Sequence, residues 1–191
     1  MIADGVTIPV PIETRRLLLR PFTPGDIEQI HYIYSDPAVW THIDGVEASR
    51  SLTETRRRVD RFITCQRQHG YSFWAVREKR TGELVGDGGL IPRVWRGPEI
   101  ELGYRFARSH WGQGFATEVA TAWLSAAFEH LELERIVAVA RADHLASRRV
   151  MERIGMTLEA FEGADVVYAI RRATPHQRQA ARGPRSPMSD Q

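Results

Sequence analysis

The residues best suited to chemistry lie in a glycine-rich run, Trp111-Gly112-Gln113-Gly114-Phe115-Ala116-Thr117-Glu118. The run follows a strand-like segment, residues 99–106, and precedes a helical one, residues 116–131. A strand that enters a helix through such a turn leaves several backbone N–H groups without an internal partner, and with the helix dipole these groups bind anions. The small residues let a bulky pyrophosphate approach the backbone. We therefore predict a phosphate-binding loop, with a plain strand-to-helix turn as the alternative.

The spacing excludes two familiar phosphate loops. No Lys-Ser or Lys-Thr pair follows the glycines, as a P-loop requires, and the G-x-G-x-x-G pattern of a dinucleotide site is absent. Glu118 falls in the first turn of the predicted helix, where a carboxylate interacts favourably with the helix dipole. We interpret Glu118 as a stabiliser of the helix start rather than as a catalyst.

Two carboxylates lie on the strand before the loop. Glu99 and Glu101 alternate with Ile100 and Leu102, so both carboxylates face one side of the strand. A carboxylate on a central strand can accept a proton from a substrate, directly or through water. For Glu101 a general base and a structural glutamate both remain open, whereas Glu99 is interpreted as structural.

The glycine-rich run resembles the acetyl-CoA pyrophosphate loop of the GNAT superfamily of N-acetyltransferases, whose pattern is R/Q-x-x-G-x-G/A. Gly114 and Ala116 occupy the two small positions, and Trp111 stands where many members have Arg or Gln. The full string W-G-Q-G-F-A-T-E is similar to the branch that acetylates N-terminal amines of ribosomal proteins (RimJ/RimL type). Further matches extend from Thr14 to about residue 172, so the resemblance covers most of the chain.

A second match covers residues 143–156, which resemble the family pattern N-x-x-S-x-x-h-h-x-K/R-h-G-F. His144 replaces the usual Asn, which holds the pantetheine amide in the family, and Met156 replaces Phe. Met151 stands where many members carry a Tyr that protonates the departing thiolate. The ribosomal-protein branch also lacks this Tyr, and there Ser147 is the polar group nearest the sulfur. A helix cap is the alternative role for Ser147.

The resemblance implies an acetyl-CoA-dependent N-acetyltransferase that works by direct attack of a primary amine in a ternary complex, with no enzyme nucleophile and no metal. The implied catalytic residues are Glu101 and Ser147. The implied cofactor-binding residues are Phe106, Ala107, Arg108, Gln113, Gly114, Phe115, Ala116, Thr117, His144 and Ser147. In the family, the first three of these offer strand backbone groups to the pantetheine arm.

The acceptor is less defined. A protein or peptide N-terminal α-amine is favoured, and a small amine such as an aminoglycoside, a polyamine or an amino-acid derivative is the alternative. A non-catalytic acyl-CoA-binding module is a third possibility. The aromatic residues Tyr34, Trp40, His42 and Trp95 could line an amine pocket or pack in the core.

Local patterns predict the elements that position these residues. Strands are expected over residues 16–22, 73–76, 84–86, 99–108, 135–140, 157–161 and 165–170, and helices over residues 27–34, 53–68, 116–131 and 146–154. Their order agrees with the fold that the resemblance implies. We expect an α+β fold of the GNAT type: a mixed, mostly antiparallel sheet of about seven strands, with about four helices on both faces.

The domain boundaries follow from composition. We expect a loosely attached N-terminal extension over residues 1–13, one domain over residues 14–174, and a disordered tail over residues 175–191 that has almost no large apolar residue. A chain of 191 residues with 42% hydrophobic and 26% charged residues is ordinary for a globular domain.

Composition also limits the partners. The pI is near 9.0, but the net charge of +2 is matched by the tail alone, so a nucleic-acid interface is not expected. No apolar run approaches the ~20 residues that span a bilayer, and no signal peptide is visible. The single Cys65 is interpreted as a structural thiol. We expect a cytoplasmic monomer or homodimer without a metal or a membrane partner.

Overall fold

The computed structural model describes residues 8–43, 47–93, 99–131 and 133–172. Eight strands form one sheet in the order β1-β2-β3-β4-β5-β6-β8-β7. All neighbouring pairs are antiparallel except β5 and β6, which are parallel. The strands are β1 (Ile12–Glu13), β2 (Leu17–Pro21), β3 (Phe73–Glu78), β4 (Leu84–Arg93), β5 (Glu99–Phe106), β6 (Arg135–Arg141), β7 (Thr157–Glu162) and β8 (Asp165–Arg171).

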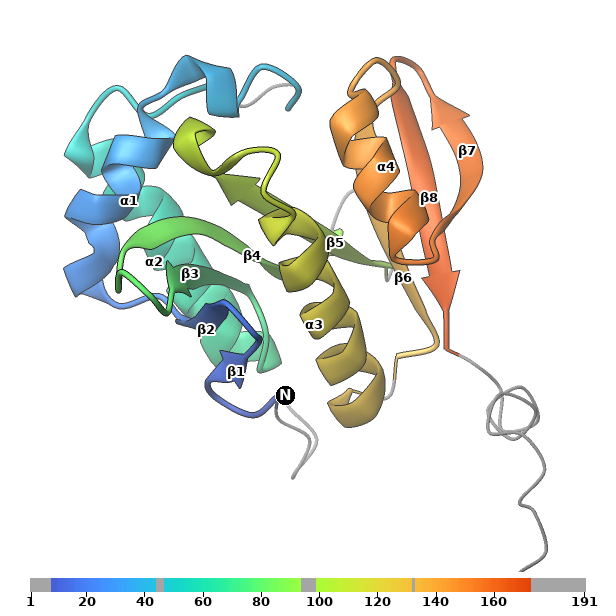
Figure 1. The fold of residues 1–191 in the computed structure, drawn as a ribbon, viewed down its shortest axis with the longest axis horizontal. Coiled ribbons are helices and arrows are strands. Elements are labelled where there is room, and N and C mark those ends of the chain that lie inside the picture. The colour runs from blue at the N-terminus through green and yellow to red at the C-terminus, as the bar shows by residue number, and fades with distance from the viewer. Residues whose placement is uncertain (1–7, 44–46, 94–98, 132, 173–191) are drawn as a thin grey trace, which may run out of the picture.

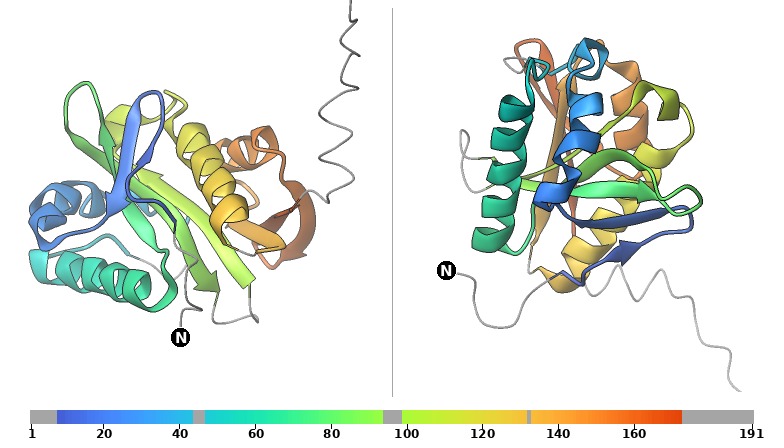
Figure 2. Two further views of the ribbon diagram at one scale, coloured as in Figure 1. Left: turned by 90° about the horizontal axis from the view of Figure 1, so that it is seen from below. Right: turned by 90° about the vertical axis from the view of Figure 1, so that its left-hand side faces the viewer.

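Four α-helices cover the two faces of this sheet: α1 (Ile27–Tyr34), α2 (Leu52–His69), α3 (Phe115–His130) and α4 (Leu145–Arg153). Short 3₁₀ turns lie at Pro24–Asp26, Pro37–Val39 and Arg108–His110. Helices α1 and α2 lie on one face, and α3 and α4 lie on the other (Figures 1 and 2). The predicted α+β architecture is therefore confirmed.

The two faces hold separate apolar clusters because strand side chains alternate between them. On the α3 face, Trp74 of β3 and Trp123 of α3 pack edge to face, with ring centroids 4.7 Å apart. Gly88 of β4 lets α3 approach the sheet, since a Cβ there would lie 2.7 Å from Val119 Cγ1. On the other face, Phe62 of α2 packs on Phe73 of β3 at 5.3 Å.

The structure differs from expectation at the N-terminus. The expected loose attachment is wrong for residues 8–13: Ile8 is buried in the core, and Ile12–Glu13 form β1, which pairs with β2. This short strand is the eighth one, because two residues are too few for an alternating pattern to be recognised. The predicted disordered tail, residues 175–191, lies outside the described residues.

The sheet opens between β5 and β6. These strands share a single paired position, Glu101 with Val137, whereas β4 pairs with β5 along its length from Gly86 to Arg93. Beyond Glu101, β5 diverges from β6 and ends at the loop before α3. Strand edges that lose their ladder partner leave backbone groups for another partner.

Candidate active site

The glycine-rich loop has the geometry of an anion site. Gly112 and Gly114 adopt left-handed conformations, with φ of 73° and 79°, and Gly114 directly precedes α3. In the part of the chain that the structure describes, no protein group accepts a hydrogen bond from the backbone N–H groups of residues 113–117. These groups converge at the positive end of the α3 dipole, so they are available to a phosphate oxygen.

Arg16 anchors this loop to the start of β2. Its Nε–H donates to Glu118 Oε2 over 2.7 Å, and its Nη1–H donates to the Gln113 carbonyl over 2.9 Å. Glu118 Oε1 also accepts from the backbone N–H of Arg16 and from the Thr14 hydroxyl. Burial opposes ionisation of Glu118, but these hydrogen bonds outweigh it and lower the pKa of its carboxyl. Glu118 therefore joins α3 to the first strands, a role that sequence reasoning missed.

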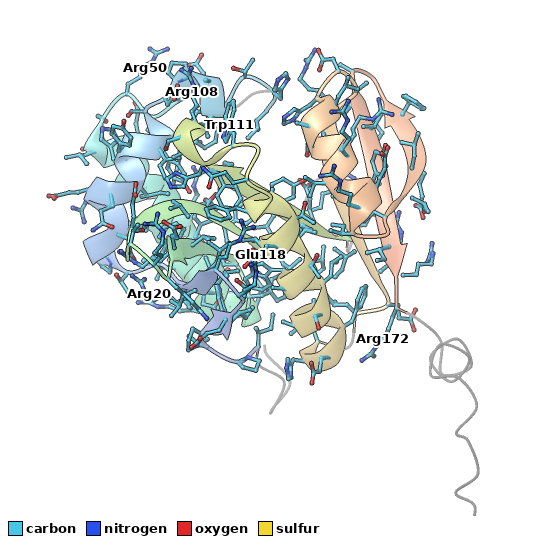
Figure 3. All side chains as sticks on the ribbon, in the orientation of Figure 1. Arg20, Arg50, Arg108, Trp111, Glu118 and Arg172 are labelled. Atoms are coloured by element: carbon cyan, nitrogen blue, oxygen red, sulfur yellow. The ribbon has the colours of Figure 1, made fainter. Side chains whose placement is uncertain are left out.

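Trp111 closes the other side of the loop. Its indole N–H donates to the Phe106 carbonyl over 2.8 Å, while half of the side chain remains exposed. Figure 3 shows Trp111 and Glu118 near opposite ends of the segment formed by the loop and the first turn of α3. The Ala107 N–H donates to the Val85 carbonyl, and the Ala107 carbonyl accepts from the His110 N–H. The expectation that Phe106, Ala107 and Arg108 offer open backbone groups is thus wrong for both Ala107 groups and for the Phe106 carbonyl. The edge without a sheet partner lies earlier, directly after Glu101.

The start of α4 contacts the segment that follows α1. His144 immediately precedes α4, and its ring stacks on His42, with centroids 4.1 Å apart and planes within 14°. Burial and the neighbouring His42 lower the pKa of the His144 imidazole, with Asp143 opposing the shift. Since a neutral imidazole has one N–H donor and one acceptor nitrogen, the His144 ring can form hydrogen bonds with an amide.

Ser147 does not cap α4. It is the third residue of the helix, the position before the helix is His144, and that position makes no side-chain capping bond. Ser147 is buried, and its hydroxyl lies 3.1 Å from the Tyr104 hydroxyl of β5. The capping alternative is therefore wrong. Tyr104, three residues after Glu101 on β5, was not identified as a site residue from the sequence.

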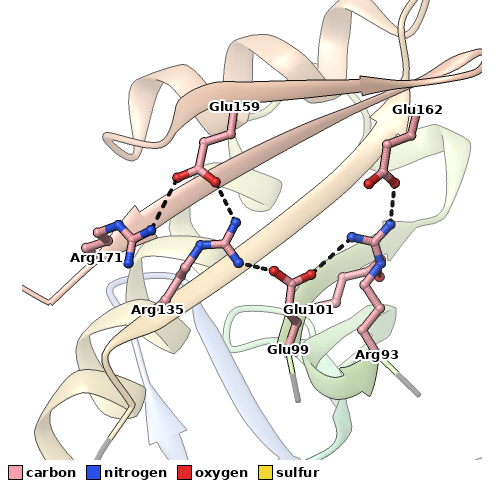
Figure 4. A network of polar contacts seen from close by, with 7 residues as sticks. All are labelled: Arg93, Glu99, Glu101, Arg135, Glu159, Glu162 and Arg171. Carbon is pink, nitrogen blue, oxygen red and sulfur yellow. Dashed lines mark hydrogen bonds and ion pairs between the residues drawn. The ribbon is translucent and has the colours of Figure 1, made fainter. Parts of the chain in front are cut away.

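Glu101 lies on the opposite face of β5, within a network of charged side chains (Figure 4). Arg93 Nε lies 3.8 Å from Glu101 Oε2, and Glu101 accepts no hydrogen bond from the described residues. Burial raises the pKa of the Glu101 carboxyl, Arg93 opposes this, and Asp165 and Glu99 add to it. Glu101 is thus a carboxylate with a strengthened affinity for a proton.

The other carboxylates of this network are held by arginines. Arg93 contacts Glu99 at 3.3 Å and Glu162 at 2.8 Å. Arg135 of β6 donates to both Glu99 and Glu159. The structural interpretation of Glu99 is therefore supported, and these ion pairs connect β4 and β5 to β6 and β7 across the point where the sheet opens.

Two of the aromatic residues considered for the acceptor side, Tyr34 and Trp40, pack in the core instead. Tyr34 and Trp40 are buried around the guanidinium of Arg105, which lies 5.2 Å and 5.0 Å from their ring centroids. Asp87, fully buried, accepts two hydrogen bonds from Arg105 and one from the Tyr34 hydroxyl. His42 stacks on His144 beside the start of α4, and Trp95 lies outside the described residues.

Other kinds of site receive no support from the described ranges. Within them, no group of three or more His, Cys, Asp or Glu residues could hold a metal ion. Nor does any helix there have the length and apolar character needed to cross a membrane. Burial raises the pKa of the Cys65 thiol, as expected of a structural cysteine.

Comparisons with known proteins identify the family. Residues 16–157 match the family model described as the acetyltransferase (GNAT) domain. The chain is 31% identical over 165 residues to YoaA, an uncharacterized N-acetyltransferase of Bacillus subtilis, over 86% of this chain and 91% of that protein. A GNAT-family acetyltransferase structure from Bacillus anthracis has a TM-score of 0.73 at 26% identity, covering 85% of this chain and 99% of that one.

Two solved structures with named acceptors share the fold. RimL, a ribosomal L7/L12 α-N-protein acetyltransferase in complex with coenzyme A, has a TM-score of 0.71 at 23% identity, covering 86% of this chain and 97% of that one. The spermidine N-acetyltransferase of Vibrio cholerae, in complex with CoA and spermine, has a TM-score of 0.68 at 20% identity, covering 83% and 97%. The family match and the identity with YoaA confirm the resemblance: the chain belongs to the GNAT family of acetyltransferases and uses acetyl-CoA as its acetyl donor.

Proposed function

We propose that this enzyme acetylates the N-terminal α-amine of a protein or peptide, by direct attack of the amine within a ternary complex. The observation that carries the proposal is the opening between β5 and β6, which has Glu101 on one face of β5 and Ser147 against the other. A thioester held in this opening would have a proton acceptor on one side and a hydroxyl on the other. Bound acetyl-CoA supplies the activated acetyl group, and the chain supplies orientation and proton movement.

The loop holds the nucleotide end in this proposal. The backbone N–H groups of residues 113–117 and the Thr117 hydroxyl bind the pyrophosphate, and His144 faces the pantetheine amide. The unpaired amides and the left-handed Gly114 support this assignment, since a side chain at that position would crowd the approach. Arg16 and Glu118 fix the loop before the nucleotide arrives.

Glu101 accepts the proton that the amine must lose. Burial has already raised the pKa of its carboxyl, and no hydrogen bond from the described residues competes for its oxygens. A general base is most effective when its pKa approaches the working pH. The Ser147 hydroxyl, on the other face of β5, donates a proton to the departing sulfur.

An α-amine fits this site better than a polyamine does. A terminal amine has an unperturbed pKa of about 8 and a lysine-type amine about 10.4, so the α-amine loses its proton more easily to a carboxylate. The carboxylates near Glu101 are held by Arg93 and Arg135, which leaves less negative charge for a polycation. The fold shared with RimL is compatible with the proposal.

The test is a comparison of acceptors. Wild-type enzyme with acetyl-CoA is given peptides with a free α-amine, the same peptides with a blocked N-terminus, spermidine and an aminoglycoside. Released thiol is measured together with the mass of each acceptor. We expect turnover with the free peptides above all. Turnover confined to spermidine or the aminoglycoside would assign a small-molecule acceptor, and coenzyme A binding without turnover would indicate a non-catalytic module.

A further inference from the structure

The Ser147 hydroxyl contacts β5 across the opening of the sheet. It lies 3.1 Å from the Tyr104 hydroxyl, which also reaches the Ser147 carbonyl as a donor over 3.3 Å. Among the described residues, no other group forms a hydrogen bond with the Ser147 hydroxyl. Met151, one turn further along α4, is buried in the core and offers no proton.

The geometry of the pair favours Tyr104 as the donor to the Ser147 hydroxyl, because that oxygen, at 3.1 Å, is nearer to the phenol than the Ser147 carbonyl oxygen, at 3.3 Å. Burial raises the pKa of the Tyr104 phenol to about 12, with the hydrogen bond to Ser147 opposing the shift. The phenol therefore keeps its proton throughout the neutral range. A serine hydroxyl has one proton and two lone pairs, so when it accepts from Tyr104 its own proton is free to point elsewhere.

The framework holds both hydroxyls in place. Helix α4 is fixed to β8 by Tyr168, whose hydroxyl donates to Glu152 and accepts from Arg148 Nε. Tyr104 is fixed by the strand pairing of β5 with β4, where it lies opposite Gly88. Rigid elements on both sides of the opening therefore set the hydroxyl–hydroxyl distance.

We propose that Tyr104 is a positioning residue, which donates to Ser147 Oγ and thereby directs the Ser147 proton into the opening, toward the departing sulfur. This inference rests on the proposed function. In the reaction, the amine nitrogen bonds to the acetyl carbon as the carbon–sulfur bond breaks. The amine loses one proton to Glu101 or water, and the sulfur gains one through Ser147, which recovers its proton from solvent.

A double-mutant cycle tests the inference, because coupled residues are not additive. We expect Ser147→Ala to lower kcat by about 10²-fold or more, as loss of a positioned acid does. Tyr104→Phe should lower kcat by about tenfold, the scale of one hydrogen bond, with KM for acetyl-CoA unchanged. In the Ser147→Ala background, Tyr104→Phe should have no further effect.

Tyr71→Phe is the matched control, since it removes another buried phenol, one that packs beside His69 at the end of α2 rather than beside α4. We expect it to reduce stability while leaving kcat nearly unchanged. Two results would overturn the inference while leaving the proposed function intact. One is an equal loss of kcat from Tyr104→Phe in the wild-type and Ser147→Ala backgrounds, and the other is a change in KM alone. Absence of turnover by the wild-type enzyme with every amine would overturn both.

A second measurement does not depend on removing the phenol. A fluorinated tyrosine at position 104 has a more acidic hydroxyl. Once deprotonated, it could only accept a hydrogen bond from Ser147, so the Ser147 proton would point at position 104 and away from the sulfur. Deprotonation at position 104 should lower kcat at alkaline pH, and in the fluorinated variant this decrease in kcat should therefore occur at lower pH. An unchanged pH profile in this variant would show that Tyr104 does not orient Ser147.

Discussion

Substitution of Gly114 tests the anion loop by charge alone. Gly114 directly precedes α3 with φ of 79°, and a Cβ there would meet only Arg16 Nη2, at the ordinary contact distance of 3.6 Å. Glu and Gln at this position share the same length and the same backbone strain, which is about 1–2 kcal/mol for a left-handed residue. The two variants differ in one negative charge, which would lie beside the Arg16 guanidinium as well as the expected pyrophosphate.

The expected magnitude follows from Coulomb's law. Two unit charges about 4 Å apart interact by about 1 kcal/mol in water and by more near a protein surface. Two pyrophosphate charges therefore give at least about 2 kcal/mol, which is about 30-fold in affinity. We expect Gly114→Glu to bind coenzyme A at least about 30-fold more weakly than Gly114→Gln, with the gap narrowing at high salt.

Calorimetric titration with coenzyme A measures the difference, and thermal unfolding verifies the fold. Gly82→Glu is the control for strain and charge, because Gly82 has φ of 71° with open space around it in the turn between β3 and β4. The Gly82→Glu variant should bind coenzyme A with wild-type affinity. Equal affinities of the Glu and Gln variants at low salt would refute the assignment of this loop to the pyrophosphate.

Three further predictions concern Glu101 and two buried carboxylates. Glu101→Gln should lower kcat by ~10²–10⁴-fold with KM for acetyl-CoA nearly unchanged, and the loss should shrink at high pH, where the amine is already neutral; activity within about threefold of wild type at pH 7 would leave Glu101 a structural role only. Asp87→Asn should lower the free energy of unfolding in urea by about 3–5 kcal/mol, because it leaves the Arg105 guanidinium buried without its partner. The double variant with Arg105→Met should recover much of that loss, and a loss below about 1 kcal/mol for the single variant would contradict this. Burial opposes ionisation of Asp26, but hydrogen bonds led by Arg20 lower its pKa far below the usual value. Its contribution to stability is therefore complete above about pH 4 and is lost as the pH falls below that, so Asp26→Asn should flatten the acid side of the stability profile, and an unaltered acid side would exclude Asp26 as its source.

The fold was predictable because its elements carry local patterns. The apolar periodicity of residues 116–131 and the apolar run of residues 135–140 mark α3 and β6 within one or two residues of their observed ends. β1 was missed because a two-residue strand has no period, and it forms only by pairing with β2.

The site was predictable only where it lies within one segment. The loop before α3 and the start of α4 are continuous in sequence, so their motifs reveal them. The bonds from Arg16 to Glu118 and from Tyr104 to Ser147 join residues far apart in the chain, and no local pattern indicates such pairs. The capping interpretation of Ser147 failed for the same reason, since only the docking of α4 beside β5 decides what its hydroxyl contacts.

The central claim is transfer of an acetyl group to an N-terminal α-amine. The most direct measurement uses one peptide that carries both a free N-terminus and an internal lysine, incubated with the wild-type enzyme and acetyl-CoA and sequenced by tandem mass spectrometry. We expect a single acetyl group, on the α-amine. Acetylation of the lysine side chain instead, or no acetylated peptide from an enzyme that binds coenzyme A, would contradict this claim.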